Sequence, residues 1–188
     1  MPAHSWYRRA ARQDLWKGSL AGSLGGLVAC WAMNQWLALW QRIVARDTPS
    51  PHGRPVAGQG GQLAREGPDA RRPPTMHAAA ALAQKFCLAV PPERTQQRLG
   101  QLLHYTFGTL TGALYGTLAE ARPQLRTGSG VPFGLTVWLL ADEVAVPLLG
   151  LSQPPTRQER SVHAYALVSH CVYGLATECT RRLVRRCL

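Results

Sequence analysis

The residues with the clearest chemical potential are two adjacent acids, Asp142 and Glu143, inside the apolar stretch VWLLADEVAVPLLGL (137–151). A carboxylate near the middle of a bilayer costs about 2.5–3.5 kcal/mol on insertion scales, so such an acid faces other helices or water. Pro147 lies four residues after Glu143 and cannot donate the backbone hydrogen bond that the Glu143 carbonyl accepts in an α-helix. The spacing therefore predicts a helix kink at Pro147, with a free carbonyl beside the acid pair.

The expected partners of these acids come from the other apolar stretches. His104, His170 and Asn34 each lie near the middle of one stretch, and Glu178 follows His170 by eight residues on the same helix face. A carboxylate beside imidazoles can hold or pass protons near neutral pH, because histidine changes its charge between pH 5 and 8. We predict an intramembrane polar cluster made of Asn34, His104, Asp142, Glu143, His170 and Glu178.

Three interpretations of this cluster stay open. Its side chains could only hydrogen-bond across helices and hold the bundle together. They could instead line a proton or ion route, or a pocket for a small ligand. A metal site is not expected, because the candidate ligands are scattered singly without a spacing such as His-Glu-x-x-His. No cofactor and no enzymatic activity are expected either, since the chain has no nucleophile beside a base and no phosphate loop.

Four apolar blocks must position these residues. The mean hydropathy of −0.13 does not reveal the blocks, because it averages over the whole chain. A helix of about 20 apolar residues crosses a hydrocarbon core of about 30 Å. The first block has 21 residues without a charge, the second is also uncharged, and the third holds only the two acids. The blocks are Leu20–Trp40, Leu99–Ala119, Val131–Leu151 and Val162–Cys179. They predict an all-α fold, an integral membrane bundle of four transmembrane helices.

The rest of the chain links and flanks these helices. A long first loop is rich in Pro and Gly, which predicts partial disorder, and a short Ala-rich amphipathic helix ends it. The predicted segments are a basic and aromatic juxtamembrane N-terminus (1–17), transmembrane helices (18–41, 93–120, 131–151, 160–180), a flexible loop (42–74), a short surface helix (75–90) and a basic C-terminal tail (181–188).

Two glycine stripes recur at four-residue spacing, and each predicts a helix-packing face. Glycine at this spacing lets two helix backbones touch, which is how helices associate in lipid. The stripes could form a homodimer seam or pack against each other inside one chain, and we favour the second interpretation because both partners are already present. The stripe residues are Gly18, Gly22 and Gly26 in the first helix and Gly108, Gly112 and Gly116 in the second.

The net charge of +11 has two interpretations, a nucleic-acid surface or membrane-facing basic flanks. Arginines gather at the ends of the apolar blocks, and no basic stripe is interleaved with aromatic residues, so we expect no nucleic-acid partner. Basic residues before the first block and after the last place both termini in the cytoplasm by the positive-inside rule. The five cysteines form no Cys-x-x-Cys pair and are expected to be packing residues.

Three stretches share the pattern of a known family: HYTFGTLTGALYG (104–116), VWLLADEVAVPLLGLSQPP (137–155) and HCVYGLATECTRR (170–182). They resemble the YagU-like bacterial inner-membrane proteins, a domain-of-unknown-function family with several predicted membrane helices. The resemblance implies a bacterial inner-membrane location and carries over no catalytic residue.

Two functions from different classes follow from these patterns. The first is a polytopic inner-membrane protein whose polar cluster is proton-responsive or related to transport. The alternative is a non-enzymatic membrane scaffold or assembly protein that packs through its glycine stripes. The expected partners are the lipid bilayer, a second copy of the chain or other membrane proteins.

Overall fold

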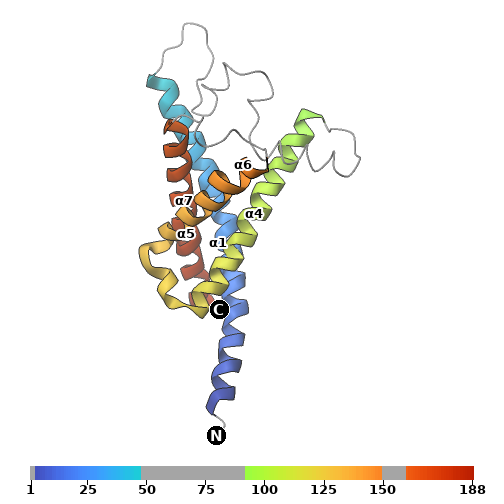
Figure 1. Ribbon diagram of the computed structural model, residues 1–188, viewed down its shortest axis with the longest axis vertical. Helices are drawn as coiled ribbons and strands as arrows, with labels where there is room; N and C mark the ends of the chain where they lie inside the picture. Colours follow the sequence, from blue (N-terminus) through green and yellow to red (C-terminus); the bar gives the residue numbers. More distant parts are fainter. Residues whose placement is uncertain (1–2, 48–91, 150–159) are drawn as a thin grey trace. The chain divides into compact units, whose positions relative to one another are not determined.

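The computed structural model describes residues 3–47, 92–149 and 160–188, and nearly all of them are helical (Figure 1). No strand occurs within these ranges. The predicted all-α class is confirmed for this part of the chain. The elements are α1 (Ala3–Asp47), α4 (Glu93–Ala121), η2 (Pro123–Gly130), α5 (Val131–Val137), η3 (Trp138–Ala145), α6 (Val146–Leu148) and α7 (Arg160–Cys187).

The chain divides into two compact units, and α1, α4 and α7 each contribute to both. The first unit consists of Met1–Met33, Tyr105–Val137 and His170–Leu188. The second consists of Asn34–His104 and Trp138–Ser169. Each unit therefore combines segments that are far apart in the sequence.

The long helices lie in parts of the sequence that are free of proline. α1, α4 and α7 contain no proline. α4 starts directly after Pro92, whose carbonyl accepts hydrogen bonds from the backbone N–H groups of Thr95 (2.8 Å) and Gln96 (3.0 Å). A proline fits this place because the first turn of a helix leaves its N–H groups without helical partners.

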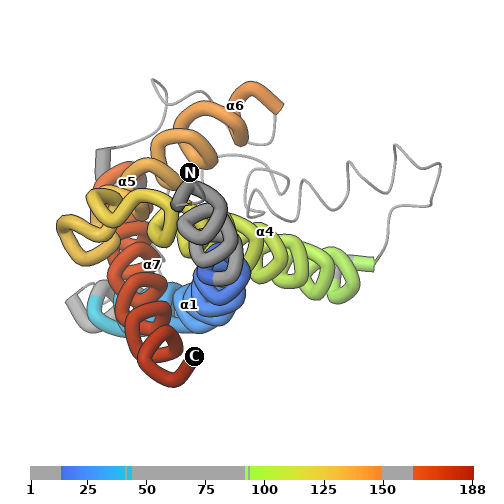
Figure 2. Tube along the Cα trace, turned by 90° about the horizontal axis from the view of Figure 1, so that it is seen from below, coloured from blue at the N-terminus to red at the C-terminus, as the bar shows by residue number. Residues whose placement is uncertain are grey.

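The glycine stripes of α1 and α4 face each other in the first unit, within one chain. A Cβ added to Gly22 would lie 2.8 Å from the Cα of Gly116, and one added to Gly112 would lie 2.8 Å from the Cα of Gly26. Only a residue without a side chain allows backbones this close. Figure 2 shows α1 beside both α4 and α7, and Gly25 of α1 is in backbone contact range of Thr177 of α7.

A second close approach joins the start of α5 to α7. Gly130 has a positive φ of 86°, a conformation that residues with a side chain rarely adopt. A Cβ there would also lie 2.8 Å from the Cβ of Glu178 and 2.9 Å from the carbonyl carbon of Gly174. Conformation and space both require glycine at this position.

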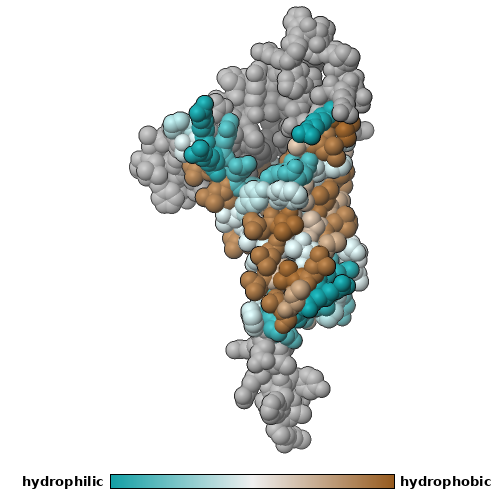
Figure 3. Space-filling view, turned by 180° about the vertical axis from the view of Figure 1, so that it is seen from behind, coloured by the Kyte–Doolittle hydropathy of each residue, from teal (hydrophilic) through white to brown (hydrophobic). Residues whose placement is uncertain are grey.

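Large apolar side chains of the described residues point outward, while small and polar ones are buried. Ala21, Ala29, Cys30 and Ala119 are fully buried, and so are Thr177 and Glu178. A helix in a soluble bundle buries its large apolar stripe instead. Figure 3 shows apolar side chains gathered on the described part of one face, beside hydrophilic ones. Exposed large apolar residues on α1 and α4 include Leu20, Leu24, Leu27, Val28, Trp31, Leu102, Phe107, Leu110, Leu114 and Leu118.

Within the described ranges, one helical stretch is long and apolar enough to cross a membrane, judged by length and composition. It is Pro123–Leu148, a run of 26 residues, and only 6% of its most apolar window is buried. The sequence predicted four such spans. The glycine, serine, threonine and charged residues that α1, α4 and α7 use for packing lower the hydropathy of those helices.

The backbone departs from α geometry over the acid pair. Residues Trp138–Ala145 form a π-helix, η3, which contains Asp142 and Glu143 and ends two residues before Pro147. The Leu149 N–H donates to the Ala145 carbonyl at 3.0 Å, so α-type bonding resumes across Pro147. The helix disturbance that Pro147 predicts therefore takes the form of a π-helix on its N-terminal side.

Several predicted boundaries differ from the structure. α1 runs without a break from Ala3 to Asp47, so the predicted N-terminal segment and the start of the predicted loop are helical. α7 continues to Cys187, so the predicted tail is helical too, because no breaker follows Cys179 and its arginines pair with carboxylates. The predicted surface helix (75–90) lies outside the described residues.

Candidate functional site

Glu178 of α7 is the centre of a buried polar network in the first unit. Its side chain is fully buried. The Arg181 guanidinium donates from Nε to Oε2 at 2.7 Å and from Nη2 to Oε1 at 2.9 Å, and Arg182 Nε donates to Oε1 at 2.7 Å. The three- and four-residue spacing brings both arginines to the same helix face as Glu178. The carboxylate is thus held by two arginines of its own helix.

Tyr115 of α4 adds a fourth bond to this carboxylate. Its hydroxyl donates to Glu178 Oε2 at 3.0 Å. The Tyr115 ring stacks on Phe133 with a centroid distance of 4.3 Å, which fixes the direction of the hydroxyl. Glu178 therefore links α7 to α4 as well as to its own helix turn.

Glu120, at the end of α4, forms the second half of the network. Arg185 Nε donates to its Oε1 at 2.8 Å, Arg181 Nη1 to the same oxygen at 3.3 Å, and Arg126 Nη2 to Oε2 at 3.1 Å. Arg126 also donates from Nε to the Ala119 carbonyl at 2.9 Å. Three arginines from two segments thus meet one carboxylate.

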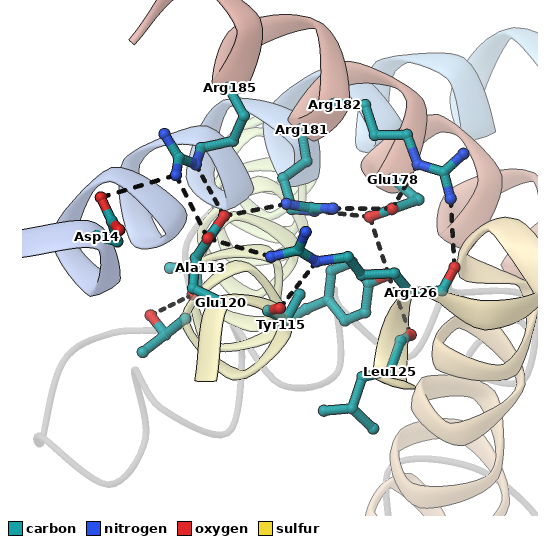
Figure 4. A network of polar contacts seen from close by, with 12 residues as sticks. Asp14, Ala113, Tyr115, Glu120, Leu125, Arg126, Glu178, Arg181, Arg182 and Arg185 are labelled. Carbon is teal, nitrogen blue, oxygen red and sulfur yellow. Dashed lines mark hydrogen bonds and ion pairs between the residues drawn. The ribbon is translucent and has the colours of Figure 1, made fainter. Parts of the chain in front are cut away.

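The Arg181 guanidinium lies between the two carboxylates and contacts both (Figure 4). Its side chain is 3% exposed. Burial alone would lower the pKa of Arg181, but the hydrogen bonds and charge of Glu178, with the charge of Glu120, hold that pKa above its ordinary value. The pKa of Arg185 is raised as well, first by its hydrogen bond to Glu120. Both arginines stay charged, so the network is permanently ionic.

A different polar pair lies in the second unit. His163 Nδ1, near the start of α7, is 2.6 Å from Glu143 Oε1 in the π-helix. The side chains are 25% and 15% exposed. In the same unit, Trp40 of α1 contacts Tyr165 of α7 with a ring centroid distance of 5.8 Å. A carboxylate bonded to an imidazole can exchange a proton with it, which the arginine network cannot do.

The structure distributes the predicted cluster over both units. Asn34, His104, Asp142 and Glu143 belong to the second unit, where the first three are half-buried. His170 and Glu178 belong to the first unit, and Glu178 pairs with arginines and Tyr115 there. A single proton-responsive site made of all six residues stays a prediction.

Sequence reasoning missed the partners of Glu178 and of Glu143. The spacing of Glu178, Arg181 and Arg182 was a readable signal of an ion pair on one helix face. The sequence pattern predicts those arginines only as a basic flank, and Glu120 lies outside the predicted polar cluster. His163 was visible in the fourth apolar block, but nothing in its spacing indicates Glu143, because the two are 20 residues apart on different helices.

No group of three or more His, Cys, Asp or Glu residues that could hold a metal ion occurs among the described residues. The cysteines in these ranges, Cys30, Cys171, Cys179 and Cys187, are free thiols. Cys30 lies in the core of the first unit with Ala29 and Tyr173.

Comparison with protein families identifies the chain's relatives. Residues 80–179, more than half of the chain, match the family described as "Protein of unknown function (DUF1440)". The chain belongs to this family. The DUF1440 region contains the Glu143–His163 pair and both network carboxylates, whereas Arg181, Arg182 and Arg185 follow it. No curated protein and no solved structure matches the chain.

Proposed function

We propose that this DUF1440 protein is a multi-pass protein of the bacterial inner membrane, in which the Glu143–His163 pair takes up and releases protons. In the first unit, helices are joined by the arginine network around Glu120 and Glu178 and by the glycine seam, where the glycine stripes of α1 and α4 meet. The single observation that carries the proposed activity is the 2.6 Å contact between Glu143, which lies in the π-helix, and His163 of α7.

The distribution of side chains supports a membrane location. Glycine and alanine line the contacts between the described helices, while leucines such as Leu110 and Leu114 are 64% and 59% exposed. On a protein surface, a large exposed apolar area of this kind marks contact with a partner or with a membrane. Helices that lie in lipid usually pack against each other through small residues. A lipid environment accounts for both features.

Helix lengths and the family resemblance support several crossings. α4 has 29 residues and α7 has 28, and at 1.5 Å per residue each exceeds the roughly 30 Å of a hydrocarbon core. The motifs similar to the YagU-like proteins favour the bacterial inner membrane. Under the positive-inside rule, the basic ends of the chain favour cytoplasmic termini.

The chemistry of the pair supports a proton-linked role. Histidine is the side chain whose charge changes between pH 5 and 8, and an ionised acid within hydrogen-bond distance stabilises its charged form. Glu143 lies in a π-helix, and π-helix segments are frequent at functional sites.

The scaffold alternative has less support. Its main feature was the pair of glycine stripes, and these stripes already face each other within the chain. A scaffold would have to use the outward leucine faces instead.

The proposal can be tested with purified protein in lipid vesicles that contain a pH-sensitive dye. After a pH step, we expect the wild-type protein to speed the internal pH change relative to empty vesicles. Glu143→Gln and His163→Gln should abolish this increase while circular dichroism stays unchanged. Asp14→Asn is the matched control, because it makes the same carboxylate-to-amide change at a site that is 54% exposed. Equal proton movement with wild type and Glu143→Gln would refute the proposed activity.

A further inference from the structure

A pocket of about 230 Å³ lies beside the network in the first unit, where α4 and α7 approach their C-terminal ends. No step of the proposed proton exchange uses it. Its walls are made almost entirely of charged side chains. They are Glu120, Arg126, Arg181, Arg182, Arg185 and Arg186, which we call the arginine pocket.

The arginine pocket carries an excess of positive charge. Five guanidinium groups line it, and the carboxylates that contact them closely are Glu120 and Glu178, which leaves three positive charges uncompensated. Asp14 approaches Arg185 only to 3.9 Å and is 54% exposed, so solvent screens its contribution. Like charges that the fold brings together without enough counter-charge favour an anionic ligand.

Several donors in the arginine pocket remain available. The Arg181 guanidinium uses all three nitrogens on the two carboxylates. In contrast, Nη1 of Arg126, Arg182 and Arg185 makes no hydrogen bond to any residue that the structure describes, and neither does the Arg186 side chain. Because Nε and Nη2 of the first three are already bonded, the direction of each remaining nitrogen is fixed.

We propose that the arginine pocket binds a phosphate-bearing anion, either the headgroup of an acidic phospholipid or free phosphate. Planar guanidinium groups match the oxygen geometry of a phosphate, and several of them can share it. The volume is below the roughly 300–1,000 Å³ of pockets for drug-sized ligands, which suits one headgroup. Basic pockets at helix ends are typical sites for acidic lipids. The proposal does not depend on the Glu143–His163 pair.

The test measures anion binding by the full-length protein in a neutral detergent. Native mass spectrometry counts bound phosphatidylglycerol, with phosphatidylcholine as the zwitterionic comparison, and calorimetry measures binding of inorganic phosphate. Arg186→Gln is the first variant, because the Arg186 side chain lines the arginine pocket and makes no hydrogen bond or ion pair within the described residues. Arg182→Gln with Arg186→Gln is the second. Arg122→Gln, an exposed arginine outside the arginine pocket, is the matched control.

We expect wild type to retain phosphatidylglycerol over phosphatidylcholine, with a dissociation constant about fivefold weaker in Arg186→Gln and more than tenfold weaker in the double variant. Arg122→Gln should bind as wild type does. Binding of phosphatidylglycerol without inorganic phosphate identifies a lipid site, and binding of both identifies a general phosphate site. Equal retention of both lipids together with no phosphate binding would overturn the proposal, as would unchanged affinity in the double variant. The vesicle experiment with Glu143→Gln tests the proposed proton exchange and is independent of anion binding in the arginine pocket.

Discussion

Two polar groups among the described residues, one in each unit, use a glutamate in opposite ways. Glu178 is fully buried and accepts four hydrogen bonds from three side chains. Glu143 is partly exposed, and its ion-pair partner within the described residues is one histidine. Arginine keeps its charge at any physiological pH, whereas histidine does not. The number and type of partners thus separate an acid that fixes structure from one that can respond to protons.

Removing the charge of Glu178 should produce the largest loss of stability. Glu178→Gln leaves Arg181 buried without a full counter-charge, and breaking a buried pair in this way costs about 3–5 kcal/mol. Thermal or denaturant unfolding in detergent measures the loss. Glu143→Gln is the comparison variant. A loss at Glu178 no larger than the loss at Glu143 would remove the distinction between the two acids.

Removing one donor from Glu178 tests whether its hydrogen bonds act together. Tyr115→Phe keeps the ring stacked on Phe133 and deletes only the hydroxyl that donates to Glu178. A hydrogen bond to a charged group contributes about 1.5–3 kcal/mol, so unfolding should become easier by that amount. Combined with Glu178→Gln, the change should have little further effect. Full additivity of the two losses would contradict a shared bond.

The glycine seam gives a way to disturb the first unit without touching either acid. Gly112→Val adds atoms where a Cβ already lies 2.8 Å from the Cα of Gly26, and such overpacking costs about 1–3 kcal/mol. Unfolding in detergent again measures the cost. Leu114→Ile, two residues along on the exposed face, should be close to neutral. Equal effects of the two variants would argue against close contact at the seam.

Neutralising Glu143 should have the smallest effect on stability. The Glu143–His163 pair is partly solvated, and exposed ion pairs contribute about 0.2–1 kcal/mol. Glu143→Gln should therefore unfold almost as wild type does while losing proton movement in vesicles. A loss above about 3 kcal/mol would make Glu143 a structural residue like Glu178.

The sequence predicted the parts of this fold that depend on residue type and spacing. Three apolar blocks without proline predicted the long helices α1, α4 and α7, and glycine at every fourth residue predicted the faces that meet in the seam. The pairing of Glu120 with Arg185 and of Glu143 with His163 was not predicted, because each depends on how separate helices are placed. Pro147 predicts a disturbed helix, but its position alone does not distinguish a π-helix from a simple kink.

The central claim is that His163 exchanges a proton under the influence of Glu143. Nuclear magnetic resonance of protein with labelled histidine, in lipid nanodiscs, measures it directly. We predict that the His163 ring nitrogen signals are broadened by proton exchange at Nδ1, and that Glu143→Gln removes this broadening because the proton loses its second acceptor. His163 signals without such exchange, or exchange that Glu143→Gln leaves unchanged, would contradict the account.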